Sequence, residues 1–331
     1  MNAVPGWRIP GRGRLLVVHQ AALGDLILAL WALRDVLGPE NLAQAFLVCQ
    51  GTWMPLAREV FGFARAFPVE SAWFSSLFSQ PDRRALEVLS SLDGAVLFSG
   101  SRELGESFSR FGPPFIRASP RPPVNLRVHV AEHLRRELSE SLFGKASEAI
   151  PSWKSLSAGT PSPLFPSRIV LHPGAGSPRK RWHLDRFLDL FQLLQSRGQS
   201  PVFVLGPAET CLWEKLTAAG VDRDCLVLPS DVGGLARLLR EAGGFVGNDS
   251  GVAHLAGFLG VPTVTVFGPS DPVRWSPLGP RSVALRAPTD CEPCFEKQKI
   301  FCQAPVCLFW MDPGQVLEAL EGLVPLNADS L

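Results

Sequence analysis

The sequence predicts an α/β protein built from two doubly wound domains. The chain has 331 residues, whereas a single hydrophobic core rarely serves more than about 250–300 residues. Hydrophobic residues make up 46% of the chain, which is enough to form packed cores. In both halves, strand patterns alternate with helix patterns, which is typical of parallel sheets covered by helices on both faces.

A proline-rich segment separates the two halves. Residues 151–167 include four prolines and several serines, a composition typical of a linker. We therefore expect an N-terminal domain over residues 1–160 and a C-terminal domain over residues 161–331.

The N-terminal half has the weaker pattern. Apolar runs predict strands at 14–19, 45–49 and 95–99, and helices are predicted at 25–37 and 130–142. Between the second and third of these strands the chain is rich in Phe and Trp but has no clear period, so it predicts no element there.

The C-terminal half is more regular and predicts a six-stranded sheet. The strands are expected at 168–172, 201–206, 225–228, 244–247, 263–267 and 282–286. The helices are expected at 185–197, 210–219, 233–242, 250–259 and 313–323. The last of these helices could pack back on the N-terminal domain.

Charge and hydropathy exclude several classes of protein. The formal net charge is +1, from 32 basic and 31 acidic residues, so there is no argument for a nucleic-acid partner. The apolar run at 26–33 is too short for a membrane span, which needs about 20 residues. The N-terminus lacks the apolar core of a secretion signal, and seven cysteines are an odd number for a disulfide framework. We expect a cytoplasmic protein that is a monomer.

The first candidate site follows the first predicted strand. Gly24 and Asp25 lie where that strand hands over to a helix, and open α/β sheets bind ligands at this edge. Asp25 either projects its carboxylate toward a ligand or caps the helix N-terminus. The loop lacks the GxGxxG pattern of dinucleotide-binding proteins.

A glycine-rich turn with basic residues follows the strand at 168–172. Gly174 and Gly176 would let backbone N–H groups approach phosphate oxygens, and Lys180 lies between two arginines just beyond. A solvated charged turn is the alternative.

Two further loops of the same half follow strands. Asp249, Ser250 and Gly251 precede a helix whose N-terminus could bind an anion, and His254 lies one turn into it. Glu209 could accept hydrogen bonds from sugar or ribose hydroxyls, or it could simply favour a helix start. Because all three loops follow parallel strands, we expect them at one edge of the sheet.

Four cysteines form the last candidate. Cys291, Cys294, Cys302 and Cys307 could hold structural zinc or an iron–sulfur cluster, but the later spacings are irregular. Packed thiols without a metal are the other interpretation, and we expect no metal in the active site.

Several motifs together resemble glycosyltransferase family 9, the ADP-heptose:lipopolysaccharide heptosyltransferases. The resemblance runs from residue 15 to about 323 and rests on ALGDLILALWAL, LHPGAGSPRKRWHLDRF, GPAE and NDSGVAHLAGFLGVPTVTVFGPSDPVRWSPLG. It implies a GT-B fold, in which two Rossmann-like domains face a central cleft. The N-terminal domain would bind the acceptor and the C-terminal domain the nucleotide-sugar.

The resemblance also implies roles for individual residues. Asp25 matches the general base, and Lys180 and Glu209 match the phosphate-binding lysine and the acid near the nucleoside. The loop and helix start that hold the diphosphate and sugar correspond to Asp249, Ser250, Gly251 and His254.

We expect inverting, metal-independent transfer of a heptose or related sugar from an ADP-sugar donor to a lipopolysaccharide-core or similar lipid-linked glycan, with no cofactor. Candidates for contacts to lipid phosphates are Arg83, Arg84, Arg121 and Arg127. The enzyme could touch the inner face of the cytoplasmic membrane peripherally. The alternatives are a nucleotide-sugar epimerase or hydrolase of the same fold, and a non-catalytic nucleotide-sugar-binding protein.

Overall fold

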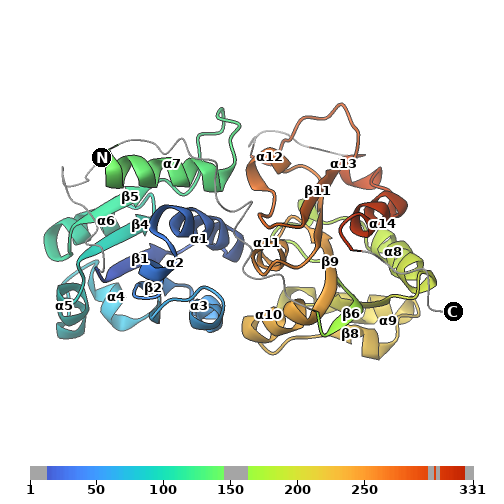
Figure 1. The fold of residues 1–331 in the computed structure, drawn as a ribbon, viewed down its shortest axis with the longest axis horizontal. Coiled ribbons are helices and arrows are strands. Elements are labelled where there is room, and N and C mark those ends of the chain that lie inside the picture. The colour runs from blue at the N-terminus through green and yellow to red at the C-terminus, as the bar shows by residue number, and fades with distance from the viewer. Residues whose placement is uncertain (1–12, 145–162, 297–301, 303–305, 325–331) are drawn as a thin grey trace. The chain divides into compact units, whose positions relative to one another are not determined.

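The computed structural model describes residues 13–144, 163–296, 302 and 306–324. By its internal contacts the chain divides into two compact units, Met1–Ser152 and Trp153–Leu331, which are described separately. Each unit contains one parallel sheet with helices on both faces (Figure 1). The α/β fold class predicted from the sequence is confirmed.

The first unit is built on a five-stranded parallel sheet with the order β3-β2-β1-β4-β5. Its strands are β1 (Leu15–His19), β2 (Phe46–Cys49), β3 (Arg65–Pro68), β4 (Gly94–Phe98) and β5 (Phe115–Ala118). Its helices are α1 (Leu23–Leu37), α2 (Pro39–Leu42), α3 (Met54–Glu59), α4 (Ala72–Ser76), α5 (Arg83–Ser90), α6 (Arg102–Phe111) and α7 (Val130–Phe143).

The helices of this unit cover the sheet as two layers. Alternate strand residues such as Leu16 and Val18 form one buried cluster with Trp73 of α4, Leu89 of α5 and Phe108 of α6. Helices α1 and α7 pack against each other over the opposite face (Figure 1). The sheet is therefore buried on both faces, as its continuous apolar strands require.

The second unit is built on a six-stranded parallel sheet with the order β11-β10-β9-β6-β7-β8. Its strands are β6 (Phe165–His172), β7 (Ser200–Val204), β8 (Leu226–Val227), β9 (Ala242–Asn248), β10 (Thr263–Phe267) and β11 (Ser282–Arg286). Its helices are α8 (Leu184–Ser196), α9 (Cys211–Ala218), α10 (Val232–Glu241), α11 (Gly251–Phe258), α12 (Pro272–Trp275), α13 (Val306–Phe309) and α14 (Pro313–Glu321).

The six strands predicted for this half are confirmed, but the linker prediction is wrong at its C-terminal end. Residues 165–167 begin β6, where Phe165 lies opposite Ala242 of β9. A proline is tolerated at an exposed strand start because no central ladder bond is lost there. Residues 151–162 lie outside the described part of the chain. Helix α14 uses its apolar face, including Val316 and Leu320, in the core of its own unit.

Strand order places the functional loops of the second unit. The chain runs outward from β6 through β7 to β8, and outward the other way from β9 through β10 to β11. The order therefore reverses between β6 and β9, and ligands of open α/β sheets bind at the carboxyl ends of the strands at such a point.

Candidate active site

The carboxyl ends of β6, β7 and β9 carry the predicted donor-site residues. Gly174, Gly176 and Lys180 follow β6, Glu209 follows β7, and the 249–251 segment follows β9. The expectation that these loops share one edge of the sheet is met, since β6 pairs with both β7 and β9.

Asn248 joins the loops after β6 and β9. It is fully buried, and its Nδ2 donates to the carbonyl of Pro173 at 2.9 Å and of Gly174 at 3.3 Å. Its Oδ1 accepts from the backbone N–H of Trp182 at 2.9 Å. One amide side chain therefore fixes both ends of the segment that contains Lys180.

The Glu209 carboxylate lies against the glycine turn. Its Oε2 accepts from the backbone N–H of Gly206 at 3.0 Å, and the residue is 7% exposed. A Cβ atom placed on Gly174 would lie only 2.6 Å from Glu209 Cδ and Oε1. Gly174 is thus required for the close approach of this carboxylate, whereas a Cβ on Gly176 would meet nothing within 4 Å.

His172 is neutral beneath this turn. It is buried, and its Nδ1 lies 3.0 Å from the carbonyl oxygen of Val204, so the ring nitrogen donates there. Burial lowers the pKa of His172, which opposes the stabilising effects of the Val204 carbonyl and the nearby Glu209 carboxylate on the charged form.

Lys180 and Asp249 form an ion pair. The Lys180 Nζ lies 2.7 Å from Asp249 Oδ2, and the side chains are 19% and 6% exposed. The same Nζ lies 4.4 Å from the centroid of the Phe295 ring. Charge and ring together hold the ammonium group at the carboxyl edge of the sheet.

Ser250, rather than Asp249, caps helix α11. Its Oγ accepts from the backbone N–H of Ala253 at 3.4 Å. Asp249 is therefore left to pair with Lys180, and His254 is buried one turn into the helix at 3% exposure. An N-terminus of this kind directs partial positive charge toward the same edge.

The two arginines beside Lys180 have different neighbours. Arg181 donates to the carbonyl of Ala175 at 3.4 Å and so supports the glycine turn. The guanidinium of Arg179 donates from Nη2 to Cys294 Sγ at 3.8 Å and lies over the Phe295 ring. The segment is thus partly exposed and partly held by contacts within the protein, and its role in phosphate binding stays a prediction.

Asp25 lies at the carboxyl edge of the first sheet. The capping interpretation is wrong, because the N-cap of α1 is Ala22 and Asp25 lies inside the first turn. Its carboxylate, 11% exposed, contacts the Arg121 guanidinium at 3.4 and 3.5 Å. Sequence reasoning proposed Arg121 as a lipid-phosphate contact and missed this pairing.

The other predicted phosphate contacts are spread over the first unit. Arg83 and Arg84 begin helix α5, where Arg83 pairs with Glu87 at 2.8 Å. Arg127 is exposed in the segment before α7. Their role as phosphate contacts stays a prediction.

The cysteine segment folds back on the loop after β10. The backbone N–H groups of Cys294 and Phe295 donate to the Pro269 carbonyl at 2.8 and 2.9 Å. Burial raises the pKa of the Cys307 thiol, and the three other cysteines of the set act in the same direction. Within the described residues, no group of three or more His, Cys, Asp or Glu side chains is arranged to hold a metal ion.

The two-sheet α/β fold is similar to that of solved GT-B glycosyltransferases. The structure of Escherichia coli heptosyltransferase WaaC with ADP is similar over 94% of this chain and all of that one, with a TM-score of 0.67 and 18% identity. A family 9 glycosyltransferase from Veillonella parvula is similar over 96% and 98%, with a TM-score of 0.69 and 18% identity. At such identities the likeness concerns the fold.

Sequence comparison finds a similar family for part of the chain. Residues 144–304 match the model of glycosyltransferase family 9 (heptosyltransferase), the segment that contains every predicted donor-site residue. The match covers 161 of the 331 residues, just under half of the chain, so the similarity to the family holds for that segment. The chain is 26% identical to lipopolysaccharide heptosyltransferase 1 of Pseudomonas aeruginosa over 61% of each chain. It is 30% identical to lipopolysaccharide heptosyltransferase 3 of E. coli K12 over 33% of each.

In the described residues no helix is long and apolar enough to cross a membrane.

Proposed function

We propose that this protein transfers a heptose or related sugar from an ADP-sugar to a lipopolysaccharide-core or similar lipid-linked glycan. The observation that carries the proposal is the Lys180–Asp249 pair, 2.7 Å apart, beside the N-terminus of α11. It lies in the segment that matches the family model, and the curated relatives are named as lipopolysaccharide heptosyltransferases.

The donor diphosphate would bind at the carboxyl edge of the second sheet. Lys180 supplies a full positive charge, and the N–H groups around Ser250 and Gly251 supply partial charges. Glu209 would accept hydrogen bonds from the ribose, and the N–H groups near Gly174 and Gly176 would approach the phosphates. His254 would lie beneath the diphosphate and sugar.

Asp25 would act as the general base. Its carboxylate would take the proton of the acceptor hydroxyl as that oxygen attacks the anomeric carbon of the donor. The bond from that carbon to the diphosphate oxygen breaks in the same displacement, so the configuration inverts. Arg121, already beside Asp25, would orient the carboxylate or an anionic group of the acceptor.

Lys180 and the α11 N-terminus would stabilise the departing diphosphate without a divalent cation. Turnover is therefore expected to persist in excess chelator, and a return of activity only on adding Mg²⁺ would contradict this part of the proposal. The acceptor is lipid-linked in this proposal, so the enzyme would act peripherally at the inner face of the cytoplasmic membrane.

The decisive experiment uses Asp25→Asn in the full chain, with ADP-heptose and a lipopolysaccharide-core acceptor. General-base assistance contributes about 10²–10⁴-fold, so transfer should fall by that factor while ADP binding is unchanged. Asp35→Asn is the matched control, because Asp35 is also on α1 and its Oδ2 lies 4.0 Å from Nε of an arginine, Arg135. The Asp35 side chain is 12% exposed, compared with 11% for Asp25.

Three outcomes would contradict the proposal. If the Asp25→Asn variant transferred the sugar at the full rate, Asp25 would not be the general base. Donor turnover at the same rate without any acceptor would show a hydrolase or epimerase, and tight ADP binding without turnover on any acceptor would show a binding protein.

A further inference from the structure

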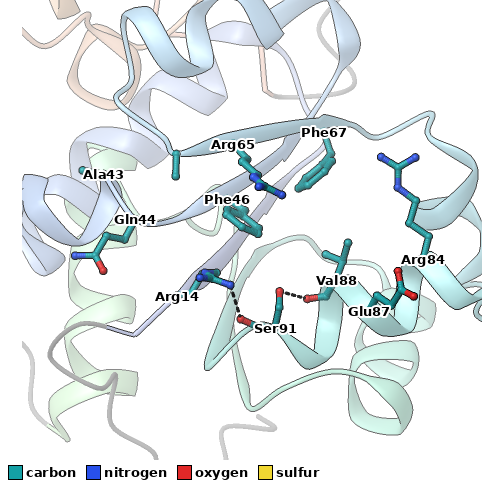
Figure 2. Close-up of a pocket in the computed structure, with 11 residues that line it drawn as sticks. Arg14, Ala43, Gln44, Phe46, Arg65, Phe67, Arg84, Glu87, Val88 and Ser91 are labelled. Carbon is teal, nitrogen blue, oxygen red and sulfur yellow. Dashed lines mark hydrogen bonds between the residues drawn. The ribbon is translucent and has the colours of Figure 1, made fainter.

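A basic pocket with aromatic walls lies in the first unit, and of its residues only Arg84 has been given a role so far, as a candidate contact to lipid phosphates. Its cavity volume is about 630 Å³. Its chemistry comes from Arg14, Arg65 and Arg84, from the rings of Phe46 and Phe67, and from Glu87 (Figure 2).

The pocket is at the opposite edge of the sheet from Asp25. Arg14 directly precedes β1, and Phe46 and Arg65 begin β2 and β3, whereas Asp25 follows the carboxyl end of β1. A five-residue strand spans roughly 16 Å. A ligand here would therefore be separate from any ligand that Asp25 contacts.

The aromatic wall holds two guanidinium groups. The Cζ atoms of Arg14 and Arg65 each lie 5.6 Å from the centroid of the Phe46 ring. Figure 2 shows the two side chains on either side of that ring. A guanidinium over an aromatic face keeps its in-plane N–H groups available for an anion.

The positive charge of the pocket is not balanced by its own carboxylate. Glu87 is engaged by Arg83 at 2.8 Å, and the Arg14 guanidinium donates to the Ser91 carbonyl at 3.4 Å. In the part of the chain that the structure describes, no carboxylate forms an ion pair with the guanidinium of Arg14, Arg65 or Arg84.

We propose that this pocket binds a phosphate group. Guanidinium groups match phosphate oxygens in pairs, and three of them border a cavity large enough for the phosphate and the group that carries it. A second pocket of about 790 Å³ borders α5 and is lined by apolar side chains including Leu86, Leu89 and Phe111. The neighbouring apolar pocket would suit the chains of a lipid whose headgroup carries the phosphate. The phosphate pocket by itself would equally suit a soluble phosphate ester.

The test has two arms, both with ADP present to occupy the donor site. One arm titrates inorganic phosphate by calorimetry. The other measures flotation with vesicles of phosphatidylcholine alone and of phosphatidylcholine with phosphatidylglycerol. The variant is Arg65→Gln with Arg84→Gln. The control is Arg58→Gln with Arg102→Gln, which removes the same charge from exposed positions outside the pocket.

The unmodified chain should bind in at least one arm, and the pocket variant should bind about tenfold more weakly or worse. The control should bind as the unmodified chain does. Binding confined to anionic vesicles identifies a lipid headgroup, and binding of inorganic phosphate identifies a soluble ester.

Absence of binding in both arms, or an equal loss in the control variant, overturns the proposal. ADP affinity and melting temperature are measured on every variant. They show that each protein is folded, and they test the donor site independently of this pocket.

Discussion

The substitution Gly174→Ala adds one carbon atom and so tests how tightly the proposed donor site is packed. The added Cβ would lie 2.6 Å from Glu209 Cδ and Oε1 and 2.7 Å from His172 Cε1. Ordinary van der Waals contact begins at 3.4 Å, so these groups must move by about 0.8 Å. Neither is free to do so, because Glu209 is bound by the Gly206 N–H and His172 by the Val204 carbonyl.

The size of the effect follows from those two restraints. Overpacking a dense site costs roughly 1–3 kcal/mol. Displacing Glu209 also removes a hydrogen bond to a charged group, which contributes about 1.5–3 kcal/mol. We expect the free energy of unfolding to fall by about 2.5–6 kcal/mol, which corresponds to a decrease in melting temperature on the order of 10 °C.

Gly176→Ala is the matched control, since its Cβ would meet nothing within 4 Å and its φ is not positive. Thermal unfolding without ligand should separate the two variants. Calorimetry with ADP should show at least about tenfold weaker binding for Gly174→Ala, because Glu209 is displaced. The reasoning is refuted if Gly174→Ala unfolds and binds ADP like the unmodified protein, or if both variants lose equal stability.

Three further outcomes are expected. Burial lowers the pKa of His19 from 6.5 to about 4, so its contribution to stability is present above pH 6.5 and is lost as the pH falls toward 4. In denaturant titrations, the free energy of unfolding should fall by about 3 kcal/mol between pH 6.5 and pH 4. His19→Asn should reduce this decrease, whereas His183→Gln, a change at an exposed histidine, should leave it as it is. Lys180→Ala should weaken ADP binding about 10- to 100-fold by calorimetry, whereas Lys215→Ala, an exposed lysine on α9, should not. In the native protein, iodoacetamide should label the exposed Cys291 and Cys302 well before the buried Cys49 and Cys307, as detected by mass spectrometry. If Cys291 and Cys302 are instead protected, and a chelator removes that protection, the result would indicate a bound metal.

The sequence predicts the second unit well because all of its strands except β8 have five or more residues, and clear turn residues bound them. The strand Thr263–Phe267 is predicted with its observed bounds, and it is buried throughout. Loop positions follow from such strands, because parallel strands bring their carboxyl ends to one edge. That is why the 173–176 turn, Glu209 and Asp249 can be grouped from the amino-acid sequence alone.

The first unit shows where such reasoning fails. Strands β3 and β5 have four residues each, and in both an arginine interrupts the apolar run, unlike in the equally short β2. Helix α6 has a detectable signal, since Ser101 caps it and Leu104 and Phe108 are spaced by one turn. Contacts between distant residues carry no local signal at all. Arg121 and Asp25 are 96 positions apart, so only the folded sheet brings them together.

The two carboxylate–cation pairs explain how a ligand could be bound without breaking either one. In each pair the carboxylate is the more buried partner, at 11% against 61% for Asp25–Arg121 and 6% against 19% for Asp249–Lys180. An ammonium group has three donors and a guanidinium has five, so a cation of either kind has more donors than one carboxylate oxygen requires. The buried carboxylate thus positions the cation, and the more exposed cation presents its remaining donors. Removing the cation has a double effect, because the ligand loses its donor and the carboxylate stays buried without its partner. Removing the carboxylate leaves a cation that water can still solvate, so ligand affinity should depend more on Lys180 than on Asp249.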